Sequence, residues 1–287
     1  ELRTHTLKVG TLAMNVCTSD PLLEDALRER SGPFLGRAAA RCQLVLTRLS
    51  APRNNGFPYH METHLLAGQL ELVSPVMRGH FQLSTGIGEL AIAPHPRFGA
   101  GVYLENALRQ ICQVILIESQ AFLVHAAAVA HPTRQKVHLF PGRSGSGKST
   151  ISALLQGAGG RVLSDDLVLL ETRDGVRVVS TPFFGSLRDT RESARPGEPL
   201  PLEGVSFLNK SSRVWREPAG PAALATAMLL ANVPFTDCFD RKHREVLMRS
   251  VSRVVENTPI QHLHFRRDLS FLPLLGWQGL AERRACP

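Results

Sequence analysis

Cysteine is scarce in this chain, and its spacing argues against two kinds of site. The 287 residues contain five cysteines, which are odd in number and far apart: Cys17, Cys42, Cys112, Cys238 and Cys286. A disulfide framework uses an even set, and the common zinc sites use closely spaced pairs. Neither is indicated, and the pattern fits a reduced cytoplasm, which is the localisation we expect.

Long apolar runs are also missing. The most apolar stretch, 111–130, is interrupted by Gln113, Glu118, Gln120 and His125. A helix that crosses a membrane needs about 20 predominantly apolar residues, so we expect no membrane-spanning segment. The sequence contains no internal repeat and no long low-complexity tract, which excludes a repeat architecture.

Acidic residues are in the minority. The chain has 25 Asp and Glu against 33 Lys and Arg, which gives a net charge of +8. Such an excess favours anionic partners, among them nucleic acid, ATP and acidic peptides. The basic residues form small dispersed groups, such as Lys210 with Arg213 and Arg216, without a basic tail or interleaved aromatic residues. We interpret most of them as solvated surface, so a nucleic-acid partner is not favoured.

The most informative segment is 142–150, which reads Gly-Arg-Ser-Gly-Ser-Gly-Lys-Ser-Thr and completes the pattern G-x-x-x-x-G-K-[ST]. In this phosphate-binding pattern the glycines let backbone N–H groups point at phosphate oxygens, and the start of a helix adds its positive end. The apolar run 137–140 predicts the strand before the loop, and 149–155 the helix after it. The sequence therefore predicts that the chain binds a nucleoside triphosphate.

Nine residues form the predicted nucleotide-binding set. Lys148 is expected to reach the β- and γ-phosphates, and Ser149 to offer its hydroxyl to Mg²⁺. The set comprises Gly142, Arg143, Ser144, Gly145, Ser146, Gly147, Lys148, Ser149 and Thr150.

Two adjacent carboxylates, Asp165 and Asp166, lie inside an apolar, strand-like run at 161–170. Neighbouring side chains point to opposite faces of a regular strand, so we expect a bend or a strand end that brings one or both toward the phosphates. The chain between Lys148 and Asp165 has room for a short helix, a glycine-rich stop and a short strand, which together return the aspartates to the loop. One carboxylate can then hold Mg²⁺ while the other accepts a proton.

These segments resemble a known family. The run Leu-Val-His-Ala-Ala-Ala-Val-Ala at 123–130, the glycine-rich loop and the run Leu-Ser-Asp-Asp-Leu-Val at 163–168 are similar to the catalytic core of the HPr kinase/phosphorylase family. The similarity is greatest to the related serine kinases found beside modified-peptide pathways, such as those of lasso peptides. Looser similarity continues in three later segments, at 181–188, 201–208 and 262–271.

The resemblance implies a fold, a reaction and roles for residues. The fold is a P-loop core related to the C-terminal domain of HPr kinase and to phosphoenolpyruvate carboxykinase, and the reaction is phosphorylation of a serine hydroxyl with ATP and Mg²⁺. Position by position, the resemblance implies that Asp165 is the general base, that Asp166 and Ser149 lie on the metal side, and that His125 is a histidine near the phosphates. Ring-forming relatives imply a homo-oligomer.

Two further points limit or extend this resemblance. The Arg-Gly signature of the bifunctional HPr enzymes is missing after the aspartates, so neither the reverse phosphorolysis nor HPr as the substrate is implied. Arg188 is an additional catalytic candidate, because a cation can stabilise charge on the transferred phosphoryl group.

The order of predicted elements indicates an α/β chain in two parts. Residues 1–100 predict a small N-terminal α+β domain with one amphipathic helix at 21–29, and residues 101–287 the kinase domain. Arginines in the loop at 189–201 are expected to form a lid or a substrate contact. The other predicted elements are strands at 8–16, 43–49, 65–73, 80–84 and 89–93 and helices at 103–118, 221–232 and 241–256.

The function we expect is transfer of the γ-phosphoryl group of ATP to a serine hydroxyl of a peptide, a small protein or a small molecule. Two alternatives remain at this point. One is a nucleotide-dependent switch that phosphorylates no acceptor, and the other is a basic ATPase stimulated by nucleic acid. The paired aspartates favour the kinase.

Overall fold

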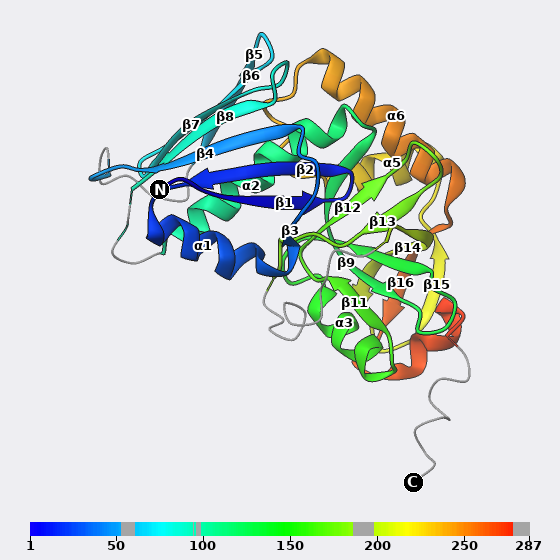
Figure 1. Cartoon of the computed structure of the whole chain (residues 1–287). Helices are drawn as coiled ribbons and strands as arrows, with labels where there is room; N and C mark the ends of the chain where they lie inside the picture. The colour runs from blue at the N-terminus through cyan, green and yellow to red at the C-terminus, as the bar shows by residue number, and fades with distance from the viewer. Residues whose placement is uncertain (53–60, 94, 96–98, 186–197, 278–287) are drawn as a thin grey trace. The chain divides into compact units, whose positions relative to one another are not determined.

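The computed structural model describes residues 1–52, 61–93, 95, 99–185 and 198–277 of the chain (Figure 1). Contacts divide the protein into two compact units, both of mixed α and β structure. Unit 1 comprises Glu1–Ser119 with Phe235–Glu245, and unit 2 comprises Gln120–Pro234 with Val246–Pro287. This division keeps the helix at 100–117 in unit 1, whereas the sequence analysis begins its second domain at residue 101.

Unit 1 is built on one mixed sheet with the strand order β3-β1-β2-β4-β8-β7-β6-β5. The pairs β2–β4 and β4–β8 are parallel, and the remaining neighbours are antiparallel. The strands are β1 (Arg3–Val9), β2 (Leu12–Thr18), β3 (Leu35–Gly36), β4 (Cys42–Arg48), β5 (Glu62–Leu66), β6 (Gln69–Ser74), β7 (Met77–Gln82) and β8 (Ile87–Ile92).

Two of the strands predicted for this unit were wrong in the same way. The single strand predicted at 8–16 is the hairpin β1–β2, which turns at Gly10, where φ is 58°. The strand predicted at 65–73 is the hairpin β5–β6, which turns at Ala67 and Gly68, both with positive φ. Glycine adopts this left-handed backbone without steric cost, and an apolar pattern on both arms hides a turn of only two residues.

The two helices of unit 1 confirm the predicted ones. Asp20 is the N-cap of helix α1 (Pro21–Ser31). Its side chain accepts hydrogen bonds from the N–H groups of Leu22 and Leu23, which stabilises the start of the helix. Helix α2 (Ala100–Ile117) packs against α1 and buries most of its residues, including the polar Glu105, Gln110 and Gln113. A short 3₁₀ helix, η1 (Gly32–Phe34), leads from α1 into β3.

Unit 2 is organised around the long, buried strand β9 (Ala121–Ala130), which pairs antiparallel with β10, β11 and β12. Because β10 also pairs with β14, and β14 returns through β13 to β12, the pairings β9–β12–β13–β14–β10 close into a ring. The strands are β10 (Val137–Pro141), β11 (Arg161–Ser164), β12 (Leu167–Glu171), β13 (Arg177–Val179), β14 (Leu200–Lys210), β15 (Trp215–Pro218) and β16 (Ile260–Phe265).

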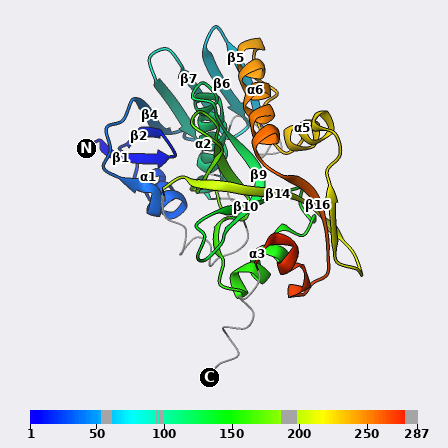
Figure 2. The same ribbon diagram turned by 90° about the vertical axis from the view of Figure 1, so that its right-hand side faces the viewer.

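Helix α3 (Lys148–Gly157) packs on β9 and forms one side of the main core of unit 2. Its residues Ile151 and Leu155 are fully buried against the C-terminal 3₁₀ helix η2 (Leu269–Leu275) and Trp277. Figure 2 shows η2 in red beside α3. The remaining helices are α5 (Ala222–Leu230), which belongs to unit 2, and α6 (Arg241–Asn257), whose residues are divided between the two units. Across the described ranges, every helix is too short or too polar to cross a bilayer.

Glu24 of α1 contacts Arg3 and His5 of β1. These contacts predict how the stability of the protein depends on acid. Hydrogen bonds from Arg3, above all, and from Arg28 and His5 lower the pKa of Glu24 from 4.5 to about 2, although burial opposes them. Because the folded-state pKa lies below the unfolded one, the stabilisation is complete above pH 4.5 and is lost as the pH falls toward 2.

We therefore expect Glu24→Gln to lower the urea midpoint at pH 7 and to have little effect at pH 2. The matched control is Glu29→Gln, which changes an exposed carboxylate on the same helix and should alter stability by no more than about 0.5 kcal/mol. Equal midpoints for Glu24→Gln and the unmodified protein at pH 7 would contradict the assigned role of Glu24.

Candidate functional site

A tight glycine-rich loop connects β10 to α3. Gly145 and Gly147 have φ of 81° and 108°, in the left-handed region that favours glycine. A Cβ on Gly147 would also lie 3.0 Å from Cζ of Phe265, and one on Gly142 would lie 2.4 Å from Oγ of Ser146. The glycines are therefore needed both for the backbone angles and for the close packing of the loop.

Lys148 begins helix α3 and folds back over this loop. Its side chain is largely buried, and Nζ donates hydrogen bonds to the carbonyl oxygens of Gly142 at 2.6 Å and Arg143 at 3.1 Å. Burial lowers the pKa of Lys148, while the negative charges of Asp166 and Asp165 oppose that shift. The ammonium group thus lies in the electrostatic field of both aspartates, and the loop carbonyls hold it.

The two aspartates lie where one strand is interrupted. Strand β11 ends at Ser164 and β12 begins at Leu167, and both pair with β9. The break is closed by hydrogen bonds: Oγ of Ser164 donates to the carbonyl of Leu167 at 2.8 Å and accepts from the N–H of Asp166 at 3.2 Å. The sequence predicted a bend at this point, and the structure has one.

Asp165 is almost completely buried, with 4% of its surface exposed. Its Oδ1 accepts a hydrogen bond from the N–H of Gly185 at 2.9 Å. A Cβ on Gly185 would lie 2.7 Å from Oδ2 of Asp165, so only glycine allows this approach. The sequence analysis gave Gly185 no role, although the residue lies in one of the segments that carried the family resemblance.

Asp166 is paired with His125 of strand β9. Nε2 of His125 lies 3.0 Å from Oδ1 of Asp166, and both side chains are partly exposed. The backbone of His125 is fixed on both sides, because its N–H donates to the carbonyl of Asn232 at 2.7 Å and its carbonyl accepts from the N–H of Gly142 at 3.2 Å. His125 therefore connects the glycine-rich loop to the second aspartate.

These groups line one cavity of about 280 Å³ in unit 2. Of the predicted nucleotide-binding residues, Gly142, Arg143 and Ser146 do not line it and instead shape the loop, while Arg188 and most of the predicted lid lie outside the described residues. The lining residues are His125, Ser144, Gly145, Gly147, Lys148, Ser149, Thr150, Asp165, Asp166, Gly185 and Lys210.

Lys210 is a second cavity residue whose position the sequence did not predict. It was grouped with Arg213 and Arg216 as solvated surface, and its side chain is indeed exposed. However, Lys210 is the last residue of β14, and it lines the same cavity as the loop residues. Its proximity depends on the parallel pairing of β14 with β10, which no local pattern in the sequence reveals.

The cavity has the groups needed for a triphosphate with Mg²⁺. Lys148 and Lys210 supply positive charge, and the exposed Ser149 and the carboxylate of Asp166 can hold a divalent ion. The described residues contain no cluster of three metal-ligating side chains. Protein-bound Mg²⁺ commonly takes only one or two carboxylates and completes its shell with phosphates and water, so one hydroxyl and one carboxylate are compatible with such an ion.

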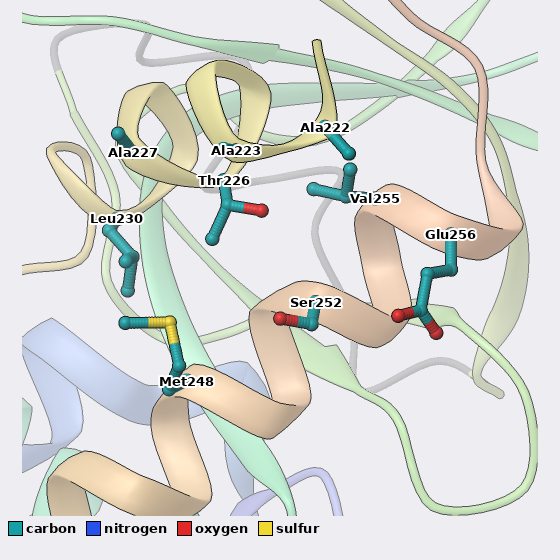
Figure 3. A pocket seen from close by; sticks show the side chains of 9 residues that line it. All are labelled: Ala222, Ala223, Thr226, Ala227, Leu230, Met248, Ser252, Val255 and Glu256. Carbon is teal, nitrogen blue, oxygen red and sulfur yellow. The ribbon is translucent and has the colours of Figure 1, made fainter.

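A larger groove in unit 2 lacks this chemistry. Figure 3 shows it between α5 and α6, with Thr226 and Leu230 on one helix facing Met248 and Ser252 on the other. Its volume is about 440 Å³, and Glu256 is the only charged residue among the described residues that line it. A groove without a cation does not suit a polyphosphate.

Comparison with protein-family models and with curated proteins finds no match for this chain. The chemistry assigned to the cavity therefore depends on the residues that line it.

The electrostatic coupling in the cavity can be measured directly. Because Asp166 and Asp165 each raise the pKa of Lys148, we expect Asp166→Asn and Asp165→Asn to lower that pKa further. NMR titration of the labelled lysine side chain measures the change. Asp174→Asn, an exposed carboxylate in the β12–β13 turn, should leave the titration unchanged. A Lys148 pKa that is the same in all four proteins would contradict the geometry described above.

Proposed function

We propose that the protein is an ATP-dependent kinase that transfers the γ-phosphoryl group to a serine hydroxyl of a peptide or small protein, as in the HPr kinase/phosphorylase family that the sequence resembles. One observation carries the proposal: six residues of the glycine-rich loop segment, Lys148 among them, line the same cavity as a pair of adjacent aspartates. Phosphoryl transfer depends mainly on positioning and on stabilising charge, and these residue types supply both.

Ser149 and Asp166 are the residues that would hold Mg²⁺, which when bound neutralises charge on the β- and γ-phosphates. His125 orients the carboxylate of Asp166 through the 3.0 Å contact. Lys148 would exchange its two carbonyl acceptors for phosphate oxygens, which are stronger partners because they are charged. We expect this exchange to restore the lysine pKa that burial lowers.

Asp165 is the proposed general base. A base must be held within hydrogen-bond reach of the hydroxyl proton it accepts, and the N–H of Gly185 holds the Asp165 carboxylate in the cavity wall. Lys210 adds a positive charge at the same cavity, where it can attract an acidic acceptor or stabilise the transferred group. The net charge of +8 also favours an acidic acceptor.

Binding of Mg-ATP tests the first half of the proposal. Lys148→Ala removes a charge-assisted contact worth about 1.5–3 kcal/mol, so we expect affinity to fall by about 10- to 100-fold. Isothermal titration calorimetry measures it, with Lys136→Ala, an exposed lysine outside the cavity, as the control. Equal affinity for Mg-ATP in Lys148→Ala and in the unmodified protein would show that the triphosphate does not bind at this loop.

The division of labour between the aspartates tests the second half. We expect Asp165→Asn to leave Mg-ATP affinity nearly unchanged and to reduce phosphoserine formation by about 10²- to 10⁴-fold, the usual effect of losing a positioned base. Asp166→Asn should instead weaken Mg-ATP binding. The assay follows phosphoserine on a degenerate library of acidic serine peptides by mass spectrometry.

Three results would contradict parts of this scheme. If Asp165→Asn abolishes Mg-ATP binding but preserves turnover per bound nucleotide, the two roles are exchanged. If Mg-ATP binds tightly and no peptide pool is phosphorylated, the nucleotide-dependent switch replaces the kinase. If ATP hydrolysis requires nucleic acid, the protein is a nucleic-acid-stimulated ATPase and not a kinase.

A further inference from the structure

Strand β15 leaves one edge of the sheet of unit 2 open. It is the last strand in the order β14-β16-β15, and all four of its residues are exposed. Figure 1 shows it in yellow beside β16, with which it pairs antiparallel. Among the described residues, no further strand pairs with its other side. The proposed kinase reaction uses no residue of this strand.

The open edge presents backbone groups of Arg216 and Pro218. The N–H of Ala219 donates to a carbonyl of the chain entering β16 at 3.1 Å, and hydrogen-bonded positions alternate along an antiparallel pair. The backbones of Trp215 and Glu217 therefore face β16, whereas those of Arg216 and Pro218 face away from it. Proline has no N–H and suits an outward-facing position of an edge strand, in agreement with this alternation. The N–H and the carbonyl of Arg216 are thus available to an added strand.

Trp215 places an apolar surface beside these backbone groups. It is 41% exposed, and its ring stacks on the ring of His264 with centroids 3.9 Å apart and planes 8° apart. Nε2 of His264 in turn lies 3.2 Å from Oε1 of Glu217. These contacts hold the indole in one orientation. An aromatic side chain that is already ordered loses little conformational entropy when a partner covers it.

The surroundings of β15 are positively charged. Lys210, Arg213 and Arg216 are exposed, and Glu217 is the only acidic residue between positions 210 and 218. Three positive charges against one negative charge leave two in excess, so an acidic strand complements this edge. A second copy of the chain would bring the same positive charges against one another, which disfavours pairing between two such edges.

Strand β15 begins at the end of the sheet where the proposed nucleotide cavity lies. Lys210, which lines that cavity, is opposite Phe265 of β16, and the preceding residue, His264, is opposite Trp215. Because neighbouring strands lie about 4.8 Å apart, a peptide added beside β15 would be three spacings, about 14 Å, from Lys210. An extended chain covers this distance in about four residues.

We propose that the open edge of β15 binds the acceptor as an added β-strand, through an acidic segment about four residues from the serine that is phosphorylated. The nature of this partner rests on the proposed kinase function. Main-chain hydrogen bonds to Arg216 supply affinity, and alternate side chains supply specificity.

The two faces of the added strand meet different side chains. Successive side chains of a strand point to opposite faces, so those of Trp215 and Arg216 flank the edge on different sides. Apolar residues of the acceptor pack beside Trp215, and acidic residues lie beside Arg216. The edge is only four residues long and ends at Pro218, and such short, proline-limited edges resist pairing with another sheet. A short peptide segment is the partner that fits.

A degenerate library of acidic serine peptides tests the surface without requiring turnover. The library is passed over the immobilised full chain with Mg²⁺ and a non-hydrolysable ATP analogue. We expect mass spectrometry of the retained peptides to show alternating apolar and acidic residues about four positions from the serine. When the retained peptides are added to the protein, hydrogen exchange of the Arg216 amide, measured by NMR, should slow by about 10-fold or more, because that N–H becomes paired.

Arg216→Pro and Arg216→Ala are the matched variants. Both remove the charge, but only the proline variant removes the outward-facing N–H. Pro218 already occupies an outward-facing position of the same strand, so the substitution is compatible with the fold, and thermal unfolding checks this. We expect Arg216→Pro to bind the retained peptides about 10-fold more weakly than Arg216→Ala, the effect of losing one hydrogen bond. Mg-ATP affinity should be equal in the two variants.

The docking surface is wrong if the unmodified protein retains no peptides, or if the two variants bind the retained peptides equally. It is also wrong if the Arg216 amide becomes protected without peptide as the protein concentration rises, because the edge then pairs with a second copy. A separate result concerns the proposed function alone. If the two variants differ in peptide binding as expected and no phosphoserine forms with Mg-ATP, the docking surface is supported and the kinase reaction is not.

Discussion

The candidate site depends on one constraint: two adjacent carboxylates interrupt a strand that pairs with β9, the buried centre of its unit. Burying such groups is unfavourable unless they are hydrogen-bonded, and here the break is satisfied locally. Ser164 bridges it from one side, and on the other side the N–H of Ala126 in β9 donates to the carbonyl of Asp166 at 2.9 Å. The backbone pairing therefore continues across the break, and the two side chains are left at the cavity.

Strand β9 also positions the other half of the site. It pairs with β10, which leads into the glycine-rich loop, and its residue His125 contacts both Gly142 and Asp166.

Closure of the pairings into a ring explains why residues from distant parts of the sequence reach this cavity. Strand β14 pairs with β13 and β10 in its first half and with β16 over Val205–Lys210, and its last residue, Lys210, lines the same cavity as the loop. Gly185 follows β13 and reaches Asp165 from another direction. The two units have different sheets, and the proposed chemistry requires residues of unit 2 alone.

The parts of this account that the sequence could predict are those encoded locally. The glycine-rich loop and the helix after it depend on residues within one short segment, and the bend at Asp165 follows from the cost of placing two carboxylates in an apolar strand. Gly185 and Lys210 could not be assigned, since their roles arise from pairings between segments far apart in the chain. The hairpins at Gly10 and Gly68 were missed because the apolar pattern runs through both turns.

The most direct test of the central claim is a crystal structure of the protein with Mg²⁺ and a non-hydrolysable ATP analogue. We expect the triphosphate in the cavity between the glycine-rich loop and the aspartates, with Mg²⁺ bound by Ser149 and Asp166. We also expect Nζ of Lys148 to have moved from the carbonyls of Gly142 and Arg143 to phosphate oxygens. An analogue bound elsewhere, or a Lys148 that still donates to those two carbonyls while the triphosphate is present, would contradict it.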